Sequence, residues 1–162
     1  MKANQESRMS VVDLKTLYET DEFEWLQLTI QLLKNRQLDS LDLENLIEEL
    51  EELSRRDKRE VSSFLKQIII HLLLLEYWKS EREVNVNHWR SEIYGFRDQL
   101  DEILTTTLRN YLEENLDFIY KRALGLVQQK TGNTVKFPLE CPYSFEKLLD
   151  LNWFPDRSWD SD

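Results

Sequence analysis

The chain has 162 residues, of which 41% are hydrophobic and 32% are charged, so it is long enough for one domain with a core and is not expected to be disordered. Its formal net charge of −10 disfavours nucleic acids and anionic membranes as partners, because binding to either requires clustered Lys and Arg. Three glycines and three prolines are too few for a sheet with its turns, and they favour long helices joined by short polar links.

The first helix with a clear predicted start follows Asp21. Before it, residues 1–10 are polar, lack the apolar core of a signal peptide and are predicted to be disordered, and residues 11–17 are predicted to form a short helical turn. Asp21 is a typical N-cap with Glu24 as its capping-box partner, and the helix should end near Asn35. Two apolar stripes predict burial on more than one side of this helix. One stripe consists of Phe23, Leu26, Ile30 and Leu33, and the other of Trp25, Leu28 and Leu32.

The second helix combines an apolar face with an acidic face, and it is predicted to begin near Asp42. The apolar face consists of Leu43, Leu46, Ile47, Leu50 and Leu53, and the acidic face of Glu44, Glu48, Glu49, Glu51 and Glu52. The apolar pattern resumes over residues 61–75, after a basic cluster at residues 55–59. One helix through both halves would be about 55 Å long, which exceeds the expected span of a compact domain of this size. We therefore predict a break or a sharp kink between Ser54 and Asp57, with a single projecting helix as the alternative.

Two further long helices are predicted in the C-terminal half. Residues 81–87 are expected to form a polar link, and the next helix should begin near Asn87. Its inward side chains are predicted to be Trp89, Ile93, Phe96, Leu100 and Ile103. Residues 105–107 are three threonines and mark the next boundary, because β-branched residues are weak in helices. A long helix should then run to Lys130, with Gly132 as its left-handed cap and with Leu108, Leu112, Leu116, Ile119, Ala123 and Val127 inward.

The end of the chain is predicted to contain a short helix from Ser144 to Leu149, followed by an acidic and aromatic tail over residues 152–162 that is partly disordered. Short links favour antiparallel neighbours. The predicted fold is therefore an all-α, up-and-down bundle of about five main helices plus short terminal helices. Residues 11–151 are predicted to form a single helical domain.

The acidic helix is the most conspicuous candidate for a metal site. A dinuclear site in a helical bundle uses inward glutamates together with Glu-x-x-His pairs, but no glutamate stands three residues before either histidine. The acidic face is therefore expected to be solvated. His71 lies in an apolar run and is expected to be a core histidine with a hydrogen-bond partner. No metal or other cofactor is predicted, and an unfamiliar site would use Glu48, Glu49 and His71.

Three other patterns carry weaker functional interpretations. Arg82 and His88 have the spacing found in helical toxin-type ribonucleases, although both fall in a predicted link. The basic cluster at residues 55–59 is explained more simply by ion pairs with the preceding glutamates than by nucleic acid, because aromatic residues do not alternate with it. Cys141 is the only cysteine, so it is expected to be a free thiol in a reducing compartment. The predicted location is therefore the cytoplasm.

A set of sequence phrases occurs in a fixed order over residues 14–150. They are Leu17-Tyr18-Glu-Thr-Asp21 with Trp25, LDLENLIEELEEL from Leu41 to Leu53, His71-Leu72-Leu73, Trp89, Arg97 and FPLECPYSFEKLL from Phe137 to Leu149. Together they resemble domain-of-unknown-function family twenty-nine, a group of helical bacterial proteins, most of them cyanobacterial. The resemblance implies a helical fold and supplies no catalytic residue, because the family has no established activity. On this basis, Trp89 and Arg97 are candidate functional positions.

This chain departs from the family's usual pattern in two places. Leu74 stands where a lysine is common, which reduces any charged role near His71. The threonines at 105–107 replace a proline-containing boundary, which should alter only the start of a helix.

The absence of a catalytic constellation and the five tryptophans predict a non-enzymatic protein-interaction or regulatory module. Trp153, Phe154 and Trp159 are the predicted interface anchors, and folding back onto the bundle is the alternative for them. The second hypothesis is an enzyme or metal protein with a site around His71 and residues 42–53, and the third is one component of a toxin–antitoxin pair. The partner is expected to be a protein, either a second copy or another chain, and not a nucleic acid or a membrane.

Overall fold

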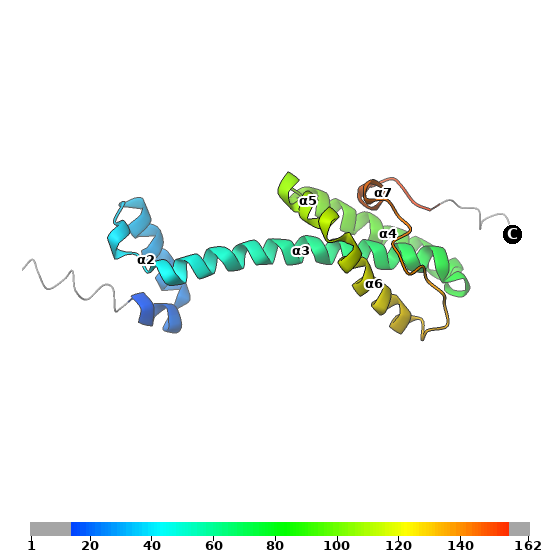
Figure 1. Ribbon diagram of the computed structural model, residues 1–162, viewed down its shortest axis with the longest axis horizontal. Coiled ribbons are helices and arrows are strands. Elements are labelled where there is room, and N and C mark those ends of the chain that lie inside the picture. Colours follow the sequence, from blue (N-terminus) through cyan, green and yellow to red (C-terminus); the bar gives the residue numbers. More distant parts are fainter. Residues whose placement is uncertain (1–13, 156–162) are drawn as a thin grey trace, which may run out of the picture. The chain divides into compact units, whose positions relative to one another are not determined.

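Every regular element in residues 14–155, the part of the chain that the computed structural model describes, is a helix (Figure 1). The predicted all-α helical bundle is therefore confirmed. The chain divides into two compact units, a first unit that ends at Arg55 and a second unit that begins at Arg56. The single domain predicted over residues 11–151 stays a prediction, and the boundary between the units falls inside a helix.

The first unit consists of a helical segment over residues 14–20, α2 (Glu22–Lys34), the 3-10 turn η1 (Leu38–Ser40) and the start of α3 (Leu43–Tyr77). The predicted N-cap of α2 is confirmed, because Asp21 Oδ1 accepts a hydrogen bond of 3.0 Å from the backbone N–H of Glu24. The N–H of Asp21 itself donates to Leu17 O at 2.7 Å. In a capping box, the side chain of Glu24 would accept the hydrogen bond of the Asp21 N–H. Here a carbonyl of the preceding helical segment accepts it instead. The predicted end of α2 at Asn35 is confirmed as well.

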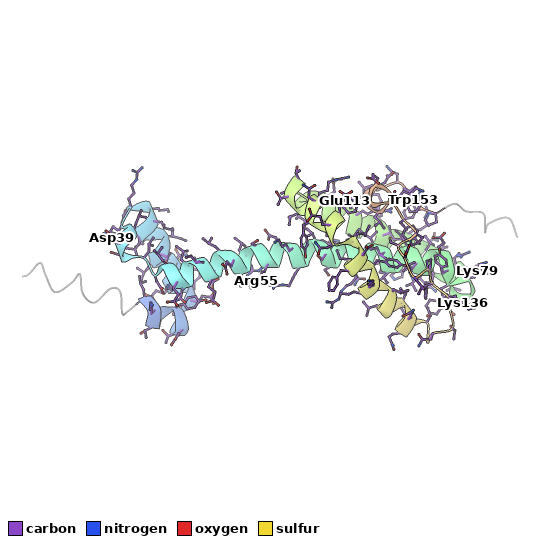
Figure 2. The ribbon with its side chains drawn as sticks, viewed as in Figure 1. Asp39, Arg55, Lys79, Glu113, Lys136 and Trp153 are labelled. Atoms are coloured by element: carbon purple, nitrogen blue, oxygen red, sulfur yellow. The ribbon has the colours of Figure 1, made fainter. Side chains whose placement is uncertain are left out.

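The break predicted between Ser54 and Asp57 is wrong, because α3 runs through both residues as one helix of 35 residues. Arg55, which is labelled in Figure 2, forms ion pairs with two glutamates of the preceding turn. Its guanidinium lies 2.9 Å from the carboxylate of Glu52 and 3.6 Å from that of Glu51. Each such pair stabilises an exposed helix by about 0.2–0.5 kcal/mol. The predicted break rested on the length limit of one compact body, and a helix shared by two compact units is not subject to that limit.

The second unit consists of the rest of α3 together with α4 (Lys79–Ile103), α5 (Thr106–Glu114), α6 (Leu116–Lys130) and α7 (Phe145–Leu149). α4 begins directly after Trp78, so the polar link predicted over residues 81–87 is wrong. Arg82 gives the physical reason. Its guanidinium donates to Leu75 O at 2.6 Å and also to Glu76 O, and it thereby satisfies carbonyls at the end of α3.

Two helices, α5 and α6, replace the single long helix predicted after the threonines. The predicted boundary is confirmed, because Thr105 Oγ1 accepts a hydrogen bond of 3.3 Å from Leu108 N–H and caps α5. The interruption falls at Asn115, whose side chain donates to Tyr111 O at 2.7 Å and competes with the backbone for that carbonyl. Gly132 has a φ of +60°, as the predicted left-handed cap after α6 requires.

The core of the second unit surrounds the second half of α3. Every side chain from Ile68 to Leu75 is buried, and a helix that is apolar all round must be covered on every side. α4 turns back along α3 (Figure 1), and the rings of Trp78 and Trp89 stack at 6.1 Å. The predicted inward positions outside residues 68–75 that are buried here are Val61, Leu65, Trp89, Ile93, Leu100, Leu112, Ile119, Ala123 and Val127. In the described range, no helix has the length and apolar character needed to cross a membrane.

Candidate interaction surface

The first unit exposes most of its large apolar side chains. Leu14 and Trp25 are its buried apolar side chains in the described range, whereas Phe23 is 72% exposed, Leu43 is 56% exposed and Leu50 is 58% exposed. The other exposed members are Leu26, Leu28, Leu33, Leu38, Ile47 and Leu53. Except for Leu38, for which no burial was predicted, the burial predicted for these residues of the first two helices is therefore wrong. A unit of this size with so small a core usually depends on a partner.

Trp25 is the centre of the core that this unit does have. Its ring is fully buried and lies 4.9 Å from the ring of Tyr18 in an edge-on contact. The Tyr18 hydroxyl donates to Glu49 at 2.6 Å, and this hydrogen bond is the main reason that the pKa of Tyr18 is raised to about 12. Lys15 pairs with Glu44 at 3.0 Å. These contacts join the helical segment 14–20 to one side of α3, and the exposed leucines of α3 lie on another side.

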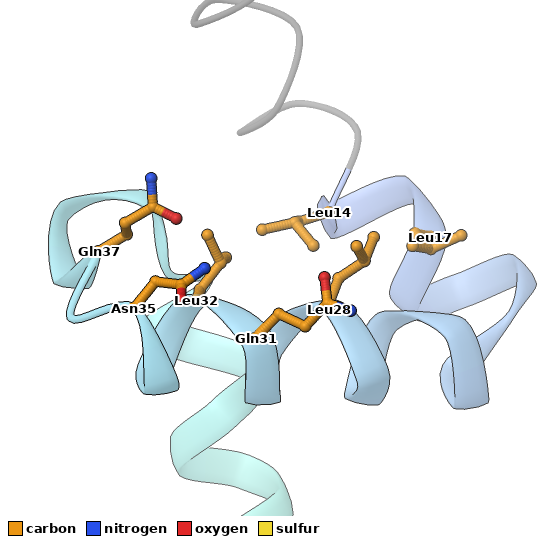
Figure 3. Close-up of a pocket in the computed structure, with 7 residues that line it drawn as sticks. All are labelled: Leu14, Leu17, Leu28, Gln31, Leu32, Asn35 and Gln37. Carbon is orange, nitrogen blue, oxygen red and sulfur yellow. The ribbon is translucent and has the colours of Figure 1, made fainter.

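An apolar groove of about 180 Å³ lies between the helical segment 14–20 and α2 (Figure 3). Its apolar lining consists of Leu14, Leu17, Leu28 and Leu32, and its polar lining of the amides Gln31, Asn35 and Gln37. Figure 3 shows Leu14 pointing toward the leucines of α2. Apolar walls with a few convergent polar groups are typical of binding sites, so this groove can take an apolar side chain of a partner.

Carboxylates accompany the exposed leucines along α3. Glu48 is exposed, and Glu49 is the half-buried acceptor for Tyr18. Both belong to the first unit, whereas His71 belongs to the second. Across residues 14–155, no group of three or more His, Cys, Asp or Glu side chains is arranged to hold a metal ion. A functional role for these three residues stays a prediction.

His71 lies in the core of the second unit and has the hydrogen-bond partner that its apolar surroundings predict. Its Nδ1 is 2.7 Å from Gln67 O, and its ring lies 5.7 Å from the ring of Phe96. Burial is the main cause that lowers the pKa of His71 below its usual value, and the hydrogen bond to Gln67 and the charge of Glu92 oppose that shift. The neutral imidazole is therefore the favoured form in the folded protein.

We expect His71 to make the stability of the protein depend on pH. Because the pKa of His71 is lower in the folded state, the unfolded chain takes up a proton first as the pH falls. The contribution of the neutral imidazole to the free energy of unfolding is therefore complete above the usual pKa of 6.5 and is lost as the pH falls below that value. This part of the pH dependence should be absent from His71→Gln. Urea unfolding of both proteins, followed by circular dichroism at a series of pH values on either side of 6.5, measures it. A stability difference that stays constant with pH would contradict the expectation.

Trp89 and Arg97 are both buried and both support the fold. Trp89 stacks on Trp78, as described above, and Arg97 is 1% exposed. Its guanidinium donates three hydrogen bonds to backbone carbonyls, to O of Lys147 at 2.8 Å, of Leu148 at 2.8 Å and of Trp153 at 2.6 Å. Burial lowers its pKa to about 10, so the group stays charged at neutral pH. Arg97 thus ties α4 to the end of α7 and to the segment that follows it.

Trp153 and Phe154 pack against the core of the second unit, which is the alternative that the sequence left open for them. The ring of Trp153, labelled in Figure 2, lies 5.8 Å from that of Tyr143. The ring of Phe154 lies 3.9 Å from the guanidinium of Arg90 and 5.4 Å from that of Arg97. Trp159 lies outside the described residues, and the interface role of the tail stays a prediction.

The remaining candidate residues are not brought together into a site. Arg82 and His88 both lie in α4, where six residues correspond to a rotation of about 240°, so they do not share a face of the helix. Arg82 is buried against the end of α3, and His88 is exposed. Cys141 is half-buried, and burial raises the pKa of its thiol, which opposes formation of the reactive thiolate.

The exposed apolar surface is the feature that sequence reasoning assigned to the core. One pattern in the sequence is compatible with such a surface. Leu43, Leu46, Leu50 and Leu53 follow one another at spacings of three, four and three, which is the heptad pattern of a helix that pairs with a helix of another chain. The same spacing also suits a helix packed within its own domain, so the pattern alone left both possibilities open.

Comparison with known proteins places the chain in a family without assigning it an activity. No curated protein and no solved structure matches it significantly. The model of a domain of unknown function, DUF29, matches residues 17–154 and thus most of both compact units. This match confirms the resemblance carried by the phrases around Trp25, Trp89 and Arg97. The protein belongs to the DUF29 family.

Proposed function

We propose that this protein is a non-enzymatic interaction module whose first unit binds a partner protein. The observation that supports the proposal is the exposure of Phe23, Leu43 and Leu50 by more than half, on a unit whose described residues bury two apolar side chains, Leu14 and Trp25. Covering a half-exposed leucine contributes roughly 1 kcal/mol. An interface that covers several of these side chains therefore stabilises both the complex and the unit itself.

The charges beside the leucines indicate what the partner presents. Glu48 is exposed on the same helix as Leu43 and Leu50. Glu44 and Glu51 are exposed there as well, and they pair with Lys15 and Arg55. An apolar patch edged by basic side chains is complementary to such a surface, and the matched charges would govern specificity and the rate of association. A cytoplasmic partner accords with the single cysteine of the sequence.

Photo-cross-linking in the cells that make the protein tests the proposal. The photo-reactive amino acid p-benzoylphenylalanine is placed at position 50, on the exposed surface, or at position 83 on α4 of the second unit, where Glu83 is exposed. We expect a discrete adduct from position 50 that position 83 does not give. Mass spectrometry of the adduct shows whether the partner is a second copy or another protein.

A matched variant shows whether the leucines cause the binding. Leu43→Gln combined with Ile47→Gln should abolish the adduct, while the free energy of unfolding should change by less than about 0.5 kcal/mol because both side chains are exposed. Equal labelling from positions 50 and 83, or an adduct that persists in the double variant, would refute the proposed interface.

A further inference from the structure

The second unit has a positively charged groove, although the chain as a whole has a net charge of −10. The groove has a volume of about 330 Å³ and lies between α3, α5 and α6. Arg59 and Lys66 of α3 and Arg122 of α6 line it, and none of the described residues that line it is acidic. Arg59 and Lys66 are two helical turns apart, so they lie on one face of α3. The fold thus gathers three cations around one hollow.

Aromatic rings lie beside these cations. Tyr111 of α5 and Phe118 of α6 both line the groove. The ammonium group of Lys58 lies 5.3 Å from the centre of the Tyr111 ring, and the guanidinium of Arg122 lies 5.9 Å from that of Phe118. Phe118 is 61% exposed, although the unit has an intact core in which other aromatic side chains are buried. An exposed phenylalanine beside clustered cations is typical of a surface that recognises a partner.

We propose that this groove binds a short acidic peptide segment of a partner protein, in which carboxylates flank an apolar or aromatic side chain. Lys66 and Arg122 attract the carboxylates and donate charge-assisted hydrogen bonds to them. The hydroxyls of Ser62 and Ser63, which also line the groove, supply further donors. Phe118 packs against the apolar side chain of the peptide. This site is distinct from the apolar surface of the first unit and does not rest on the function proposed for that surface.

The observations favour a peptide over the phosphate backbone of a nucleic acid. A nucleic acid is bound by Lys and Arg arranged along an extended track on a basic surface. Here the three cations line a single hollow on a chain of net charge −10, and the remaining surface repels a long polyanion. A volume of about 330 Å³ accommodates a few side chains of a peptide.

Fluorescence anisotropy with the full chain tests the proposal. The probes are a labelled peptide in which glutamates alternate with phenylalanine and leucine, its counterpart with glutamine at each glutamate, and a labelled single-stranded oligonucleotide of similar length. We expect the glutamate peptide to bind, with an affinity that falls about tenfold for each cation removed in Lys66→Gln and Arg122→Gln. Phe118→Ser should weaken binding about fivefold through loss of apolar contact. Lys121→Gln removes the same charge from an exposed position on α6 outside the groove and should change the affinity less than twofold.

Three results would overturn the inference. The first is a glutamate peptide that binds no more tightly than its glutamine counterpart. The second is binding that the Lys66→Gln and Arg122→Gln double variant leaves unchanged, with circular dichroism showing that the variant keeps its helices. The third is an oligonucleotide that binds more tightly than the peptide through the same residues. Leu43→Gln with Ile47→Gln should leave peptide binding intact, which separates failure of this site from failure of the first one.

Discussion

Arg97→Ala is expected to lower the free energy of unfolding of the second unit by about 3–5 kcal/mol. The guanidinium is 1% exposed and satisfies three carbonyls, those of Lys147, Leu148 and Trp153. Alanine leaves these oxygens without a donor, and each unsatisfied buried group costs about 1–3 kcal/mol. Urea unfolding monitored by tryptophan fluorescence measures the loss, and hydrogen exchange over residues 145–155 should show that this segment opens first.

Two matched variants separate geometry from charge at this position. Arg97→Lys keeps the charge but cannot reproduce the planar fork of donors that reaches three carbonyls, so it should recover only part of the lost stability. Arg122→Ala removes an exposed arginine from the same unit and should change the free energy of unfolding by less than about 1 kcal/mol. A loss below about 1 kcal/mol in Arg97→Ala would show that other donors replace the guanidinium.

Trp25→Ala is expected to unfold most of the first unit while the second unit stays folded. Truncation of a buried tryptophan costs about 3–5 kcal/mol, and Leu14 is the other buried apolar side chain described in this unit. The variant also removes the ring that Tyr18 contacts at 4.9 Å, so the helical segment 14–20 loses its anchor. Hydrogen exchange should therefore show loss of protection over residues 14–35, and protection over residues 61–75 should be retained.

Trp25→Phe provides the control, because it keeps an aromatic ring at the position. The indole N–H of Trp25 is buried and has no hydrogen-bond acceptor among the described residues, so its removal leaves none of their carbonyls or carboxylates without a donor. We expect this variant to retain the protection of residues 14–35 that Trp25→Ala loses. If Trp25→Ala retained that protection as well, contacts other than the tryptophan core would be holding the unit together.

The sequence by itself determined which segments are helical and how several of them begin and end. Hydrophobic spacing of three and four identified the buried sides of α4 and α6. The caps at Asp21 and Gly132 and the helix boundary at residues 105–107 were placed correctly. These features depend on neighbours within a few residues, because helix periodicity and capping are local properties of the backbone. The sequence left two alternatives for Trp153 and Phe154, an exposed interface or packing on the bundle. Their packing involves Tyr143 and Arg90, which are not local neighbours in the chain.

Only the tertiary structure decided which apolar stripes are covered and which cations meet. Leu43 and Leu50 follow the same spacing as the buried residues of α4, yet they are exposed, because burial depends on whether another segment lies against the stripe. Arg122 and Phe118 line the same groove as Arg59, although more than fifty positions in the chain separate each of them from Arg59. Arg97 likewise donates a hydrogen bond to the backbone of Trp153. Contacts at such separation follow from how the helices pack, and no local pattern of residue types encodes them.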